Sequence, residues 1–496
     1  MSVRTHTTGC GSLDSDNYQQ QLRSDLREWI EQNPSDNFNP DSAFEQWCQV
    51  VKSTVSSHCN KKRRHRKPKP VWWSTRIARS IQRRNRARRL AQRLCDTRSA
   101  RAYQEQARRT RKLIRKAKRS AWKRLCHSLS PQSAHRTFRR LEAPTELPAV
   151  VSHPDNHSSY SDDSQISHHM GRYYSLVGSV PDAESRPVPQ FPQKAPLTDP
   201  ELDAPISLAE VEFQVKRLVT RKAPGDDAIW PFMLKEGGPI ITESLLHLFN
   251  SCWLSSSFPS SWNHAVIVPV PKESSARTFD KFRPISLLSI VSKLFDSIMN
   301  TRLQRVSDRH DWIPSYQASF RKHRTPLEHL IRLQQSAHSA LRRRQILLVA
   351  FLDIKQAYDS VSRPILLSKL RSLGLGGLML PYLISFLSNR TGSLRYRLSS
   401  SRPFDFQYGV PQGSPISPLL YSIYAASAIS DAGPLKAQAA DDLAVWATRP
   451  DSAQFPDGAY FIAKPFIPTS VKFSQSPVSA TFLIPKSDSE HSSSSL

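Results

Sequence analysis

The stretch that decides the fold is ILLVAFLDIKQAYDSV, residues 346–361. It begins with a short apolar run, 346–352, which predicts a buried β-strand and is too short to span a membrane. The strand ends in a carboxylate, Asp353, and a second one, Asp359, follows just beyond the bend. Burying an ionised carboxylate is costly unless it is paired or binds a metal. Asp353 is therefore either a cap of the following turn or a metal ligand.

A pair of adjacent acids further along the chain favours the metal. Asp441 and Asp442 lie between two short alternating runs, 435–440 and 443–446, which predicts a hairpin with the acids at its tip. Carboxylates on neighbouring strand ends suit Mg²⁺, which keeps several waters and takes substrate phosphates. Two ions about 4 Å apart would serve an in-line phosphoryl displacement. We therefore expect the Asp441–Asp442 pair to lie within about 10 Å of Asp353, since ligand distances to Mg²⁺ are only about 2.1 Å.

A third stretch, GVPQGSPISPLL at residues 409–420, combines a strand end, a turn that backbone can bring close to a ligand, and a helix start. Together with FLDIKQAYDSV (351–361) and AQAADDLAVW (437–446), it resembles motifs A, B and C of the reverse transcriptases of non-LTR (LINE-type) retrotransposons. The order and spacing of the three stretches agree with that family, and the joint match is specific where any one motif would be weak.

The resemblance implies an α+β fold, the fingers and palm of a right-hand polymerase, and an RNA-directed DNA polymerase activity that adds dNTPs to a primer 3′-hydroxyl. The implied partners are an RNA template, a DNA primer or target, and dNTPs, and the implied cofactor is a pair of Mg²⁺ ions. The implied catalytic and metal-binding residues are Asp353 and Asp441, which would hold both ions, and the ancillary Asp442.

The resemblance also implies how the nucleotide is held. Tyr358 matches the steric-gate position, where a ring beneath the sugar excludes a 2′-hydroxyl. The implied contacts to the triphosphate and to the rest of the nucleotide come from Lys272 and Arg283, and from Gln412 and Gly413.

Charge is concentrated in one segment. Residues 61–140 hold 30 Lys and Arg and only two acids. The rest of the chain has equal numbers of basic and acidic residues, so this segment accounts for the whole formal net charge of +28. Two basic helices are expected, at 74–94 and 99–129. Because so few acids offset the repulsion, the segment predicts a nucleic-acid partner. The run KKRRHRKPK, residues 61–69, indicates either phosphate contact or import into the nucleus, with a solvated linker as the equal alternative.

Five regions are expected along the chain. They are a polar and helical N-terminal segment (1–60), a basic helical linker (61–140), a disordered linker with one short helix near 170–175 (141–200), the fingers and palm (201–449) and a disordered tail (451–496). Six scattered cysteines with no CxxC pair fit a reducing intracellular compartment. No signal peptide or membrane span is apparent, so we expect a soluble protein.

The chain also departs from the family pattern. Ser319 stands where glycine is usual, Ala439 stands where motif C carries an aromatic, and neither the thumb nor an upstream endonuclease is recognisable. We therefore expect this chain as written to show weak or no processive synthesis, and one alternative is a truncated, catalytically weak or inactive relic that only binds nucleic acid. A group II-type maturase polymerase is a weaker one. The template, the target site and the oligomeric state cannot be read from the sequence.

Overall fold

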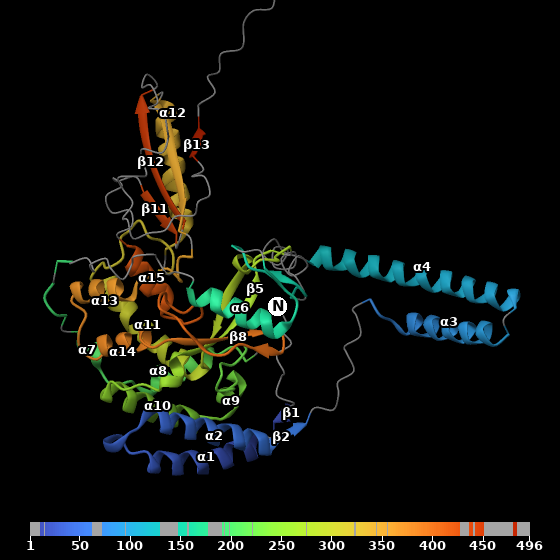
Figure 1. Ribbon diagram of the computed structural model, residues 1–496, viewed down its shortest axis with the longest axis horizontal. Helices are drawn as coiled ribbons and strands as arrows, with labels where there is room; N and C mark the ends of the chain where they lie inside the picture. The colour runs from blue at the N-terminus through green and yellow to red at the C-terminus, as the bar shows by residue number, and fades with distance from the viewer. Residues whose placement is uncertain are drawn as a thin grey trace, which may run out of the picture. The chain divides into compact units, whose positions relative to one another are not determined.

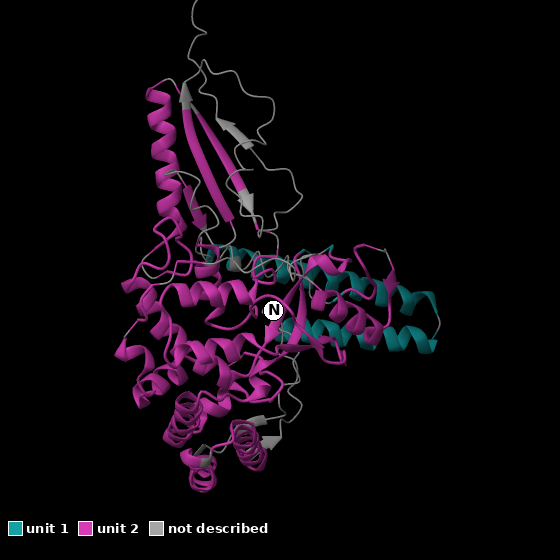
Figure 2. Ribbon diagram, turned by 60° about the vertical axis from the view of Figure 1, so that its left-hand side comes forward, with its two compact units in different colours: residues 1–13, 59–147, 273–275 teal, residues 14–58, 148–272, 276–496 magenta. Residues whose placement is uncertain are grey.

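The computed structural model describes residues 10–13, 15–61, 72–94, 96–128, 147–155, 158–176, 191–192, 194–197, 199–220, 222–273, 275–321, 324–343, 345–354, 356–426, 436–439, 442–450 and 480–483. The chain divides into two compact units, coloured separately in Figure 2. The first comprises residues 1–13, 59–147 and 273–275, and the second comprises residues 14–58, 148–272 and 276–496. Most of the expected basic run and nearly all of the expected tail lie outside the described residues.

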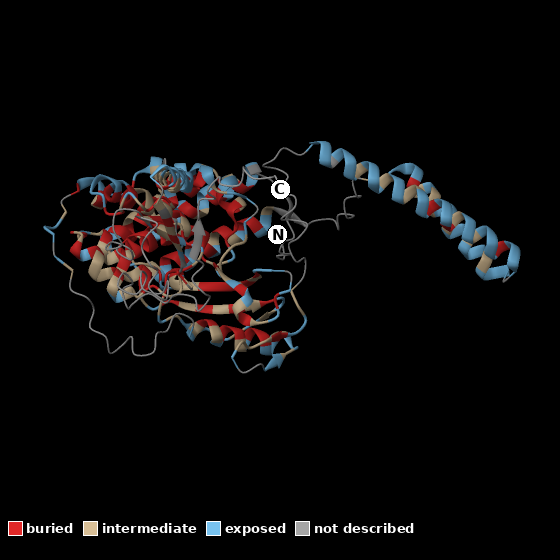
Figure 3. Ribbon diagram, turned by 90° about the horizontal axis from the view of Figure 1, so that it is seen from above, coloured by how far each residue is buried: buried red, intermediate tan, exposed pale blue. Residues whose placement is uncertain are grey.

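The first unit is a helical hairpin with a small ladder. Strand β1 (Cys10–Leu13) pairs antiparallel with β2 (Cys59–Lys61), and helices α3 (Thr75–Leu94) and α4 (Thr97–Ser128) pack together. Both helices were predicted from sequence within about two residues. Their contact is narrow: Ile77 and Ala107 are buried, and the hydroxyls of Ser80 and Thr110 are hydrogen-bonded at 2.9 Å. Most of the surface of α3 and α4 is exposed (Figure 3).

The N-terminal helices belong to the core of the second unit. Helices α1 (Ser15–Gln32) and α2 (Pro40–His58) flank a 3-10 turn, η1 (Ser35–Asn37), and pack against α10 (Pro239–Ser255). Trp47 donates from Nε1 to the Ser244 hydroxyl at 3.0 Å, and the Tyr18 hydroxyl donates to the Met233 carbonyl at 3.0 Å. Both helices were predicted, but their packing partners were not.

The expected linker 141–200 needs a correction. Strands β3 (Val151–Ser152) and β4 (Ser159–Tyr160) pair, and helix α6 (Asp163–Leu176) is far longer than the short helix predicted near 170–175. The physical reason is an apolar stripe at helical spacing. Ile166, Met170 and Tyr174 are all buried, and Gly171 lets the helix lie close to the ring of Phe404.

One sheet carries the basic residues predicted for the nucleotide site. Its strands run in the order β10 (Phe404–Asp405), β8 (Thr391–Tyr396), β5 (His264–Pro271) and β6 (Phe282–Leu287), and β9 (Ser399–Ser400) pairs with β8. Strands β5 and β6 are antiparallel, whereas β5 and β8 are parallel.

Helices pack around an aromatic core in the second unit. Phe295 of α11 (Ile290–Arg309) contacts the rings of Phe249, Trp262 and Tyr382 at centroid distances of 5.3, 5.6 and 5.2 Å. Helix α8 (Leu208–Arg217) is capped by Ser207, which forms a capping box with Glu210. The remaining elements are α7 (Pro200–Asp203), α9 (Pro231–Glu236), η2 (Ser260–Asn263), η3 (Phe279–Lys281), α13 (Arg363–Ser372), α14 (Met379–Leu387) and α15 (Ser417–Ala425).

The second sheet contains the apolar run 346–352 and Asp353, which follows it. Its order is β11 (Lys436–Ala439), β12 (Asp442–Pro450), β7 (Gln345–Asp353) and β13 (Ala480–Leu483), and α12 (Pro326–Arg342) lies along it (Figure 1). Leu347, Val349 and Trp446 are buried with Ala340 of that helix. The predicted strand and hairpin are confirmed. Among the described residues, no helix is long and apolar enough to cross a bilayer.

Candidate active site

The acids of the first and third motifs come together through backbone pairing. Strands β7 and β12 are antiparallel, and their register sets Asp353 opposite Asp442. Residues directly opposite in an antiparallel pair have Cα atoms about 4.5–5.5 Å apart. These two backbones therefore lie well within the predicted 10 Å. Asp442 is exposed, while the side chain of Asp353 and the whole of Asp441 lie outside the described residues.

The chemistry of this donor set fits a hard divalent cation. Carboxylate oxygens are the ligands that Mg²⁺ prefers. Among the described side chains there is no cluster of three potential ligands. The side chains of Asp353 and Asp441 lie outside the described residues, so the backbone register is the observation that supports the site.

The predicted turn between the acids is fastened to the end of the first motif. The Gly409 amide donates to the Val361 carbonyl at 2.8 Å, and the Val410 amide donates to the Tyr358 carbonyl at 2.9 Å. Gly409 has a φ of 83°, and a Cβ there would lie 2.9 Å from backbone atoms of Tyr358 and Asp359. Only glycine permits both the conformation and the close approach.

The other side of the turn docks on β6. The Ser286 amide donates to the Gln412 carbonyl at 3.0 Å. Gly413 has a φ of 151°, and a Cβ there would lie 2.4 Å from the Ser286 carbonyl oxygen. The turn is thus held between the end of the first motif and strand β6, which carries Arg283.

The side chain of Gln412 is held by Asp359. Gln412 donates from Nε2 to Asp359 Oδ2 at 2.9 Å. Burial raises the pKa of Asp359 to about 6, while the hydrogen bond from Gln412 and the charge of Lys272 act to lower it. Asp359 was noted in the sequence as a second carboxylate, but nothing in the pattern connected it to Gln412.

Ser414, on the far side of Gly413, is held by a buried carboxylate that the sequence analysis missed. Asp296 of α11 is only 2 % exposed and accepts from the Ser414 hydroxyl and from the Tyr382 hydroxyl, both at 2.7 Å. Burial raises the pKa of Asp296, and these two hydrogen bonds oppose that rise. The available signal was an acid within the apolar helical pattern SKLFDSIM, residues 292–299.

Lys272 and Arg283 lie at the same end of the β5–β6 ladder. Val270 pairs with Arg283, and Lys272 follows directly after β5. Lys272 donates from Nζ to the Asp280 carbonyl at 2.8 Å. Burial and the neighbouring Arg283 lower the pKa of Lys272, and Asp280 and Asp359 act to raise it. The structure therefore places both predicted cations and the Asp359–Gln412 pair in one electrostatic neighbourhood.

Tyr358 is positioned by a ring contact. Its ring stacks on that of Tyr421 of α15, with centroids 5.1 Å apart and an interplanar angle of 19°. Offset stacking of this kind restricts the ring, which suits a residue that must present a fixed edge. The steric-gate role of Tyr358 remains a prediction.

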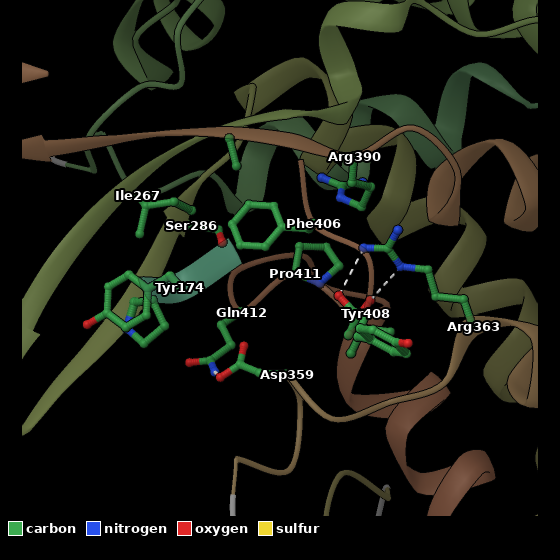
Figure 4. Close-up of a pocket in the computed structure, with 14 residues that line it drawn as sticks. Tyr174, Ile267, Ser286, Asp359, Arg363, Arg390, Phe406, Tyr408, Pro411 and Gln412 are labelled. Atoms are coloured by element: carbon green, nitrogen blue, oxygen red, sulfur yellow. Dashed lines mark hydrogen bonds between the residues drawn. The ribbon is translucent and has the colours of Figure 1, made fainter. Parts of the chain in front are cut away.

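A cavity of about 40 Å³ lies behind the turn (Figure 4). Its wall includes Asp359 and Gln412, and two arginines also line it. Arg363 donates to the carbonyls of Tyr408 and Gly409, each at 3.0 Å. Arg390 is 4 % exposed and donates from Nη1 to the Phe386 carbonyl at 2.8 Å, while its Nη2 has no partner among the described residues.

The two departures from the expected pattern have different outcomes. The glycine expected at position 319 suggests a positive φ there. In the structure the residue with a positive φ is instead the next one, Phe320, with a φ of 62°. The Ser319 amide donates to Gln317 Oε1 at 3.1 Å. The side chain of Ala439 lies outside the described residues, so the expected space beneath the hairpin stays untested.

The chain is similar in sequence to known RNA-directed DNA polymerases. The family described as reverse transcriptase (RNA-dependent DNA polymerase) matches residues 270–455. A probable RNA-directed DNA polymerase from transposon BS of Drosophila melanogaster is 32% identical over 45% of this chain and 24% of its own length. The RNA-directed DNA polymerase from mobile element jockey of D. melanogaster is 29% identical over 59% of this chain and 32% of its own length. The corresponding protein of D. funebris is 28% identical over 74% of this chain and 42% of its own length.

The chain therefore spans about a quarter to two fifths of these relatives. Among solved structures, a Candida albicans telomerase bound to a telomeric RNA fragment has a TM-score of 0.28 at 17% identity, over 38% of each chain. The RNA-dependent RNA polymerase of a human picobirnavirus also has a TM-score of 0.28, at 11% identity over 44% of this chain and 42% of that one.

Gly413→Ala should lower the free energy of unfolding by about 1–3 kcal/mol, because the new Cβ meets the Ser286 carbonyl and the backbone conformation is unfavourable for alanine. Urea unfolding measures this. Gly376→Ala is the matched control, since nothing lies within 4 Å of a Cβ there. Equal stability of the two variants would show that the turn can leave β6 freely.

Asp296→Ala should destabilise the second unit by about 2–4 kcal/mol, since it leaves two buried hydroxyls without an acceptor. Asp296→Asn, which keeps one acceptor oxygen, should cost less. Thermal and urea unfolding would compare them with Asp308→Ala, an exposed acid on the same helix. If the alanine variant at 296 were no less stable than that control, the two hydrogen bonds would not be holding the turn.

Proposed function

We propose that this chain, which carries the reverse transcriptase domain of a LINE-type non-LTR retrotransposon, acts as an RNA-directed DNA polymerase with residues 201–449 as fingers and palm. The substrates are dNTPs, the template is RNA, and the primer supplies a DNA 3′-hydroxyl. The observation that carries the proposal is the register of β7 and β12, which sets Asp353 beside Asp442. The family match over residues 270–455 supports the same assignment.

Asp353, Asp441 and Asp442 would hold two Mg²⁺ ions. When bound, such ions lower the pKa of the attacking hydroxyl and neutralise charge on the leaving pyrophosphate. The protein sets the backbone positions of Asp353 and Asp442, because β7 and β12 are paired along nine residues. Asp441, which directly precedes Asp442 in the sequence, would complete the set.

The nucleotide would lie between this ladder and the β5–β6 ladder. Lys272 supplies a point charge and Arg283 a planar fork for the triphosphate. Gln412 and Gly413 bring an amide and an unobstructed backbone to the nucleotide, and Tyr358 sets the edge that a 2′-hydroxyl would meet. Holding both reactants in attack geometry is the main contribution such a site can make.

The first unit would bind the nucleic acid. Helices α3 and α4 are largely exposed, and their residues hold 20 Lys and Arg against one acid, Glu105. Such a surface neutralises phosphates and releases counterions, which drives binding with little regard to sequence. Import into the nucleus through residues 61–69 is a second proposed use of this charge. Neither the relatives nor the described site favours the alternative of an inactive relic.

Single-nucleotide incorporation on an RNA template tests the polymerase. Asp353→Asn should lower the rate at least roughly 10³-fold, because it removes a charged ligand of both ions. Asp405→Asn is the matched control, an exposed acid at the end of a strand in the other sheet. Background incorporation by the unmodified chain, or undiminished activity of the Asp353 variant, would overturn the proposal.

Salt titrations of the full chain test the basic helices. Replacing Arg115, Lys116 and Arg119 of α4 with Gln should weaken RNA binding and reduce the slope of log K against log salt by up to about three. Arg27→Gln on α1 is the control for charge alone. A slope that stays the same in the triple variant would show that these helices do not contact phosphates.

A further inference from the structure

Asp359 makes a connection that the reaction as proposed does not use. It lies six residues beyond Asp353, and it lines the cavity behind the turn. Its side chain accepts one hydrogen bond from the described residues, from Gln412 Nε2 at 2.9 Å. Figure 4 shows the two side chains meeting below Pro411, with the amide nitrogen toward the carboxylate.

This hydrogen bond selects the orientation of the Gln412 amide. An ionised carboxylate has only acceptors, so it takes the NH₂ end and leaves Oε1 as the end available to a ligand. Among the described residues nothing donates to Oε1. A protonated Asp359 can itself donate, and the amide can then turn so that Oε1 faces inward and the NH₂ group faces the ligand.

We propose that Asp359 is a positioning residue that acts through Gln412, so that its ionisation decides whether the turn presents a hydrogen-bond acceptor or a donor to the incoming nucleotide. The inference rests on the proposed polymerase function and adds to it a dependence of nucleotide use on pH.

The groups around Asp359 place this switch in an accessible pH range. Lys272 faces it from the end of β5, with Asp280 beyond, Tyr173 and Tyr174 face it from α6, and Arg363 and Arg390 line the same cavity. Burial raises the pKa of Asp359 to about 6, despite the opposing effects of Gln412 and Lys272. Above that pH the carboxylate is ionised and the acceptor faces outward; as the pH falls through 6 the acceptor is lost.

Ionisation of Asp359 favours the outward-facing acceptor of Gln412, but it disfavours the folded state. Because burial raises the pKa of Asp359 from its ordinary value of about 3.8 to about 6, stability falls as the pH rises between these two values, and the whole penalty is present above about pH 6. Asp359→Asn should therefore keep or raise the melting temperature at pH 7.5. A residue retained only for structure would lower it.

The test is single-nucleotide incorporation by the full chain on a primed RNA template with Mg²⁺, from pH 5 to 8.5, with melting temperatures measured in parallel. We expect Asp359→Asn to raise the KM for dNTP about 10-fold at pH 7.5, to change kcat less than about 3-fold, and to remove the wild-type loss of kcat/KM below pH 6. Gln412→Ala and the double variant should match each other, because Asp359 acts only through Gln412. Asp405→Asn should behave as wild type.

The outcomes are separable. An unmodified chain that incorporates no nucleotide overturns the proposed function and this inference with it. A working polymerase in which Asp359→Asn keeps the wild-type pH profile, or in which the two substitutions have additive effects, overturns the inference alone. A melting temperature lowered by Asp359→Asn, together with a fall in kcat at unchanged KM, would assign Asp359 a structural role and likewise overturn it.

Discussion

The antiparallel ladder between β7 and β12 is the interaction on which the site depends. It joins residues almost a hundred positions apart in the chain, and it converts two separate acidic motifs into one location. The ladder is stabilised on one face by α12, where Leu347, Val349 and Trp446 are buried with Ala340. The apolar residues of β7 therefore do two things: they provide the packing energy, and through the register they set where Asp353 ends up.

The turn at residues 409–414 is the second constraint, and it works by close backbone approach. Gly409 allows the chain to lie against residues 358–361, and Gly413 allows it to lie against Ser286. Neither contact leaves space for a Cβ. The turn consequently links residues 358–361, which follow β7 in the chain, to strand β6, and backbone hydrogen bonds on both sides limit the relative movement of these parts.

The charged groups buried near this turn, Asp296, Asp359 and Arg390, form hydrogen bonds with uncharged partners. Asp296 has two hydroxyl donors, Asp359 has one amide donor, and Arg390 bonds to a carbonyl. Each buried charge keeps part of its desolvation cost, which these hydrogen bonds offset. Such groups persist where they specify geometry. Here they fix Ser414 and Gln412 on either side of Gly413.

The sequence by itself determined the local elements and the motifs. The apolar run before Asp353, the alternating runs around Asp441–Asp442 and the basic helices could all be read from residue periodicity and charge, because these signals are local. It did not determine the extent of α6, most of which falls in the segment predicted to be a disordered linker, nor the roles of Asp296 and Asp359. Those depend on which surfaces meet: α6 is ordered by packing on β8, and Asp359 acquires its raised pKa and its partner only when the turn folds back on the first motif. Burial and long-range pairing carry no short-range sequence signal, and so the tertiary structure alone decided them.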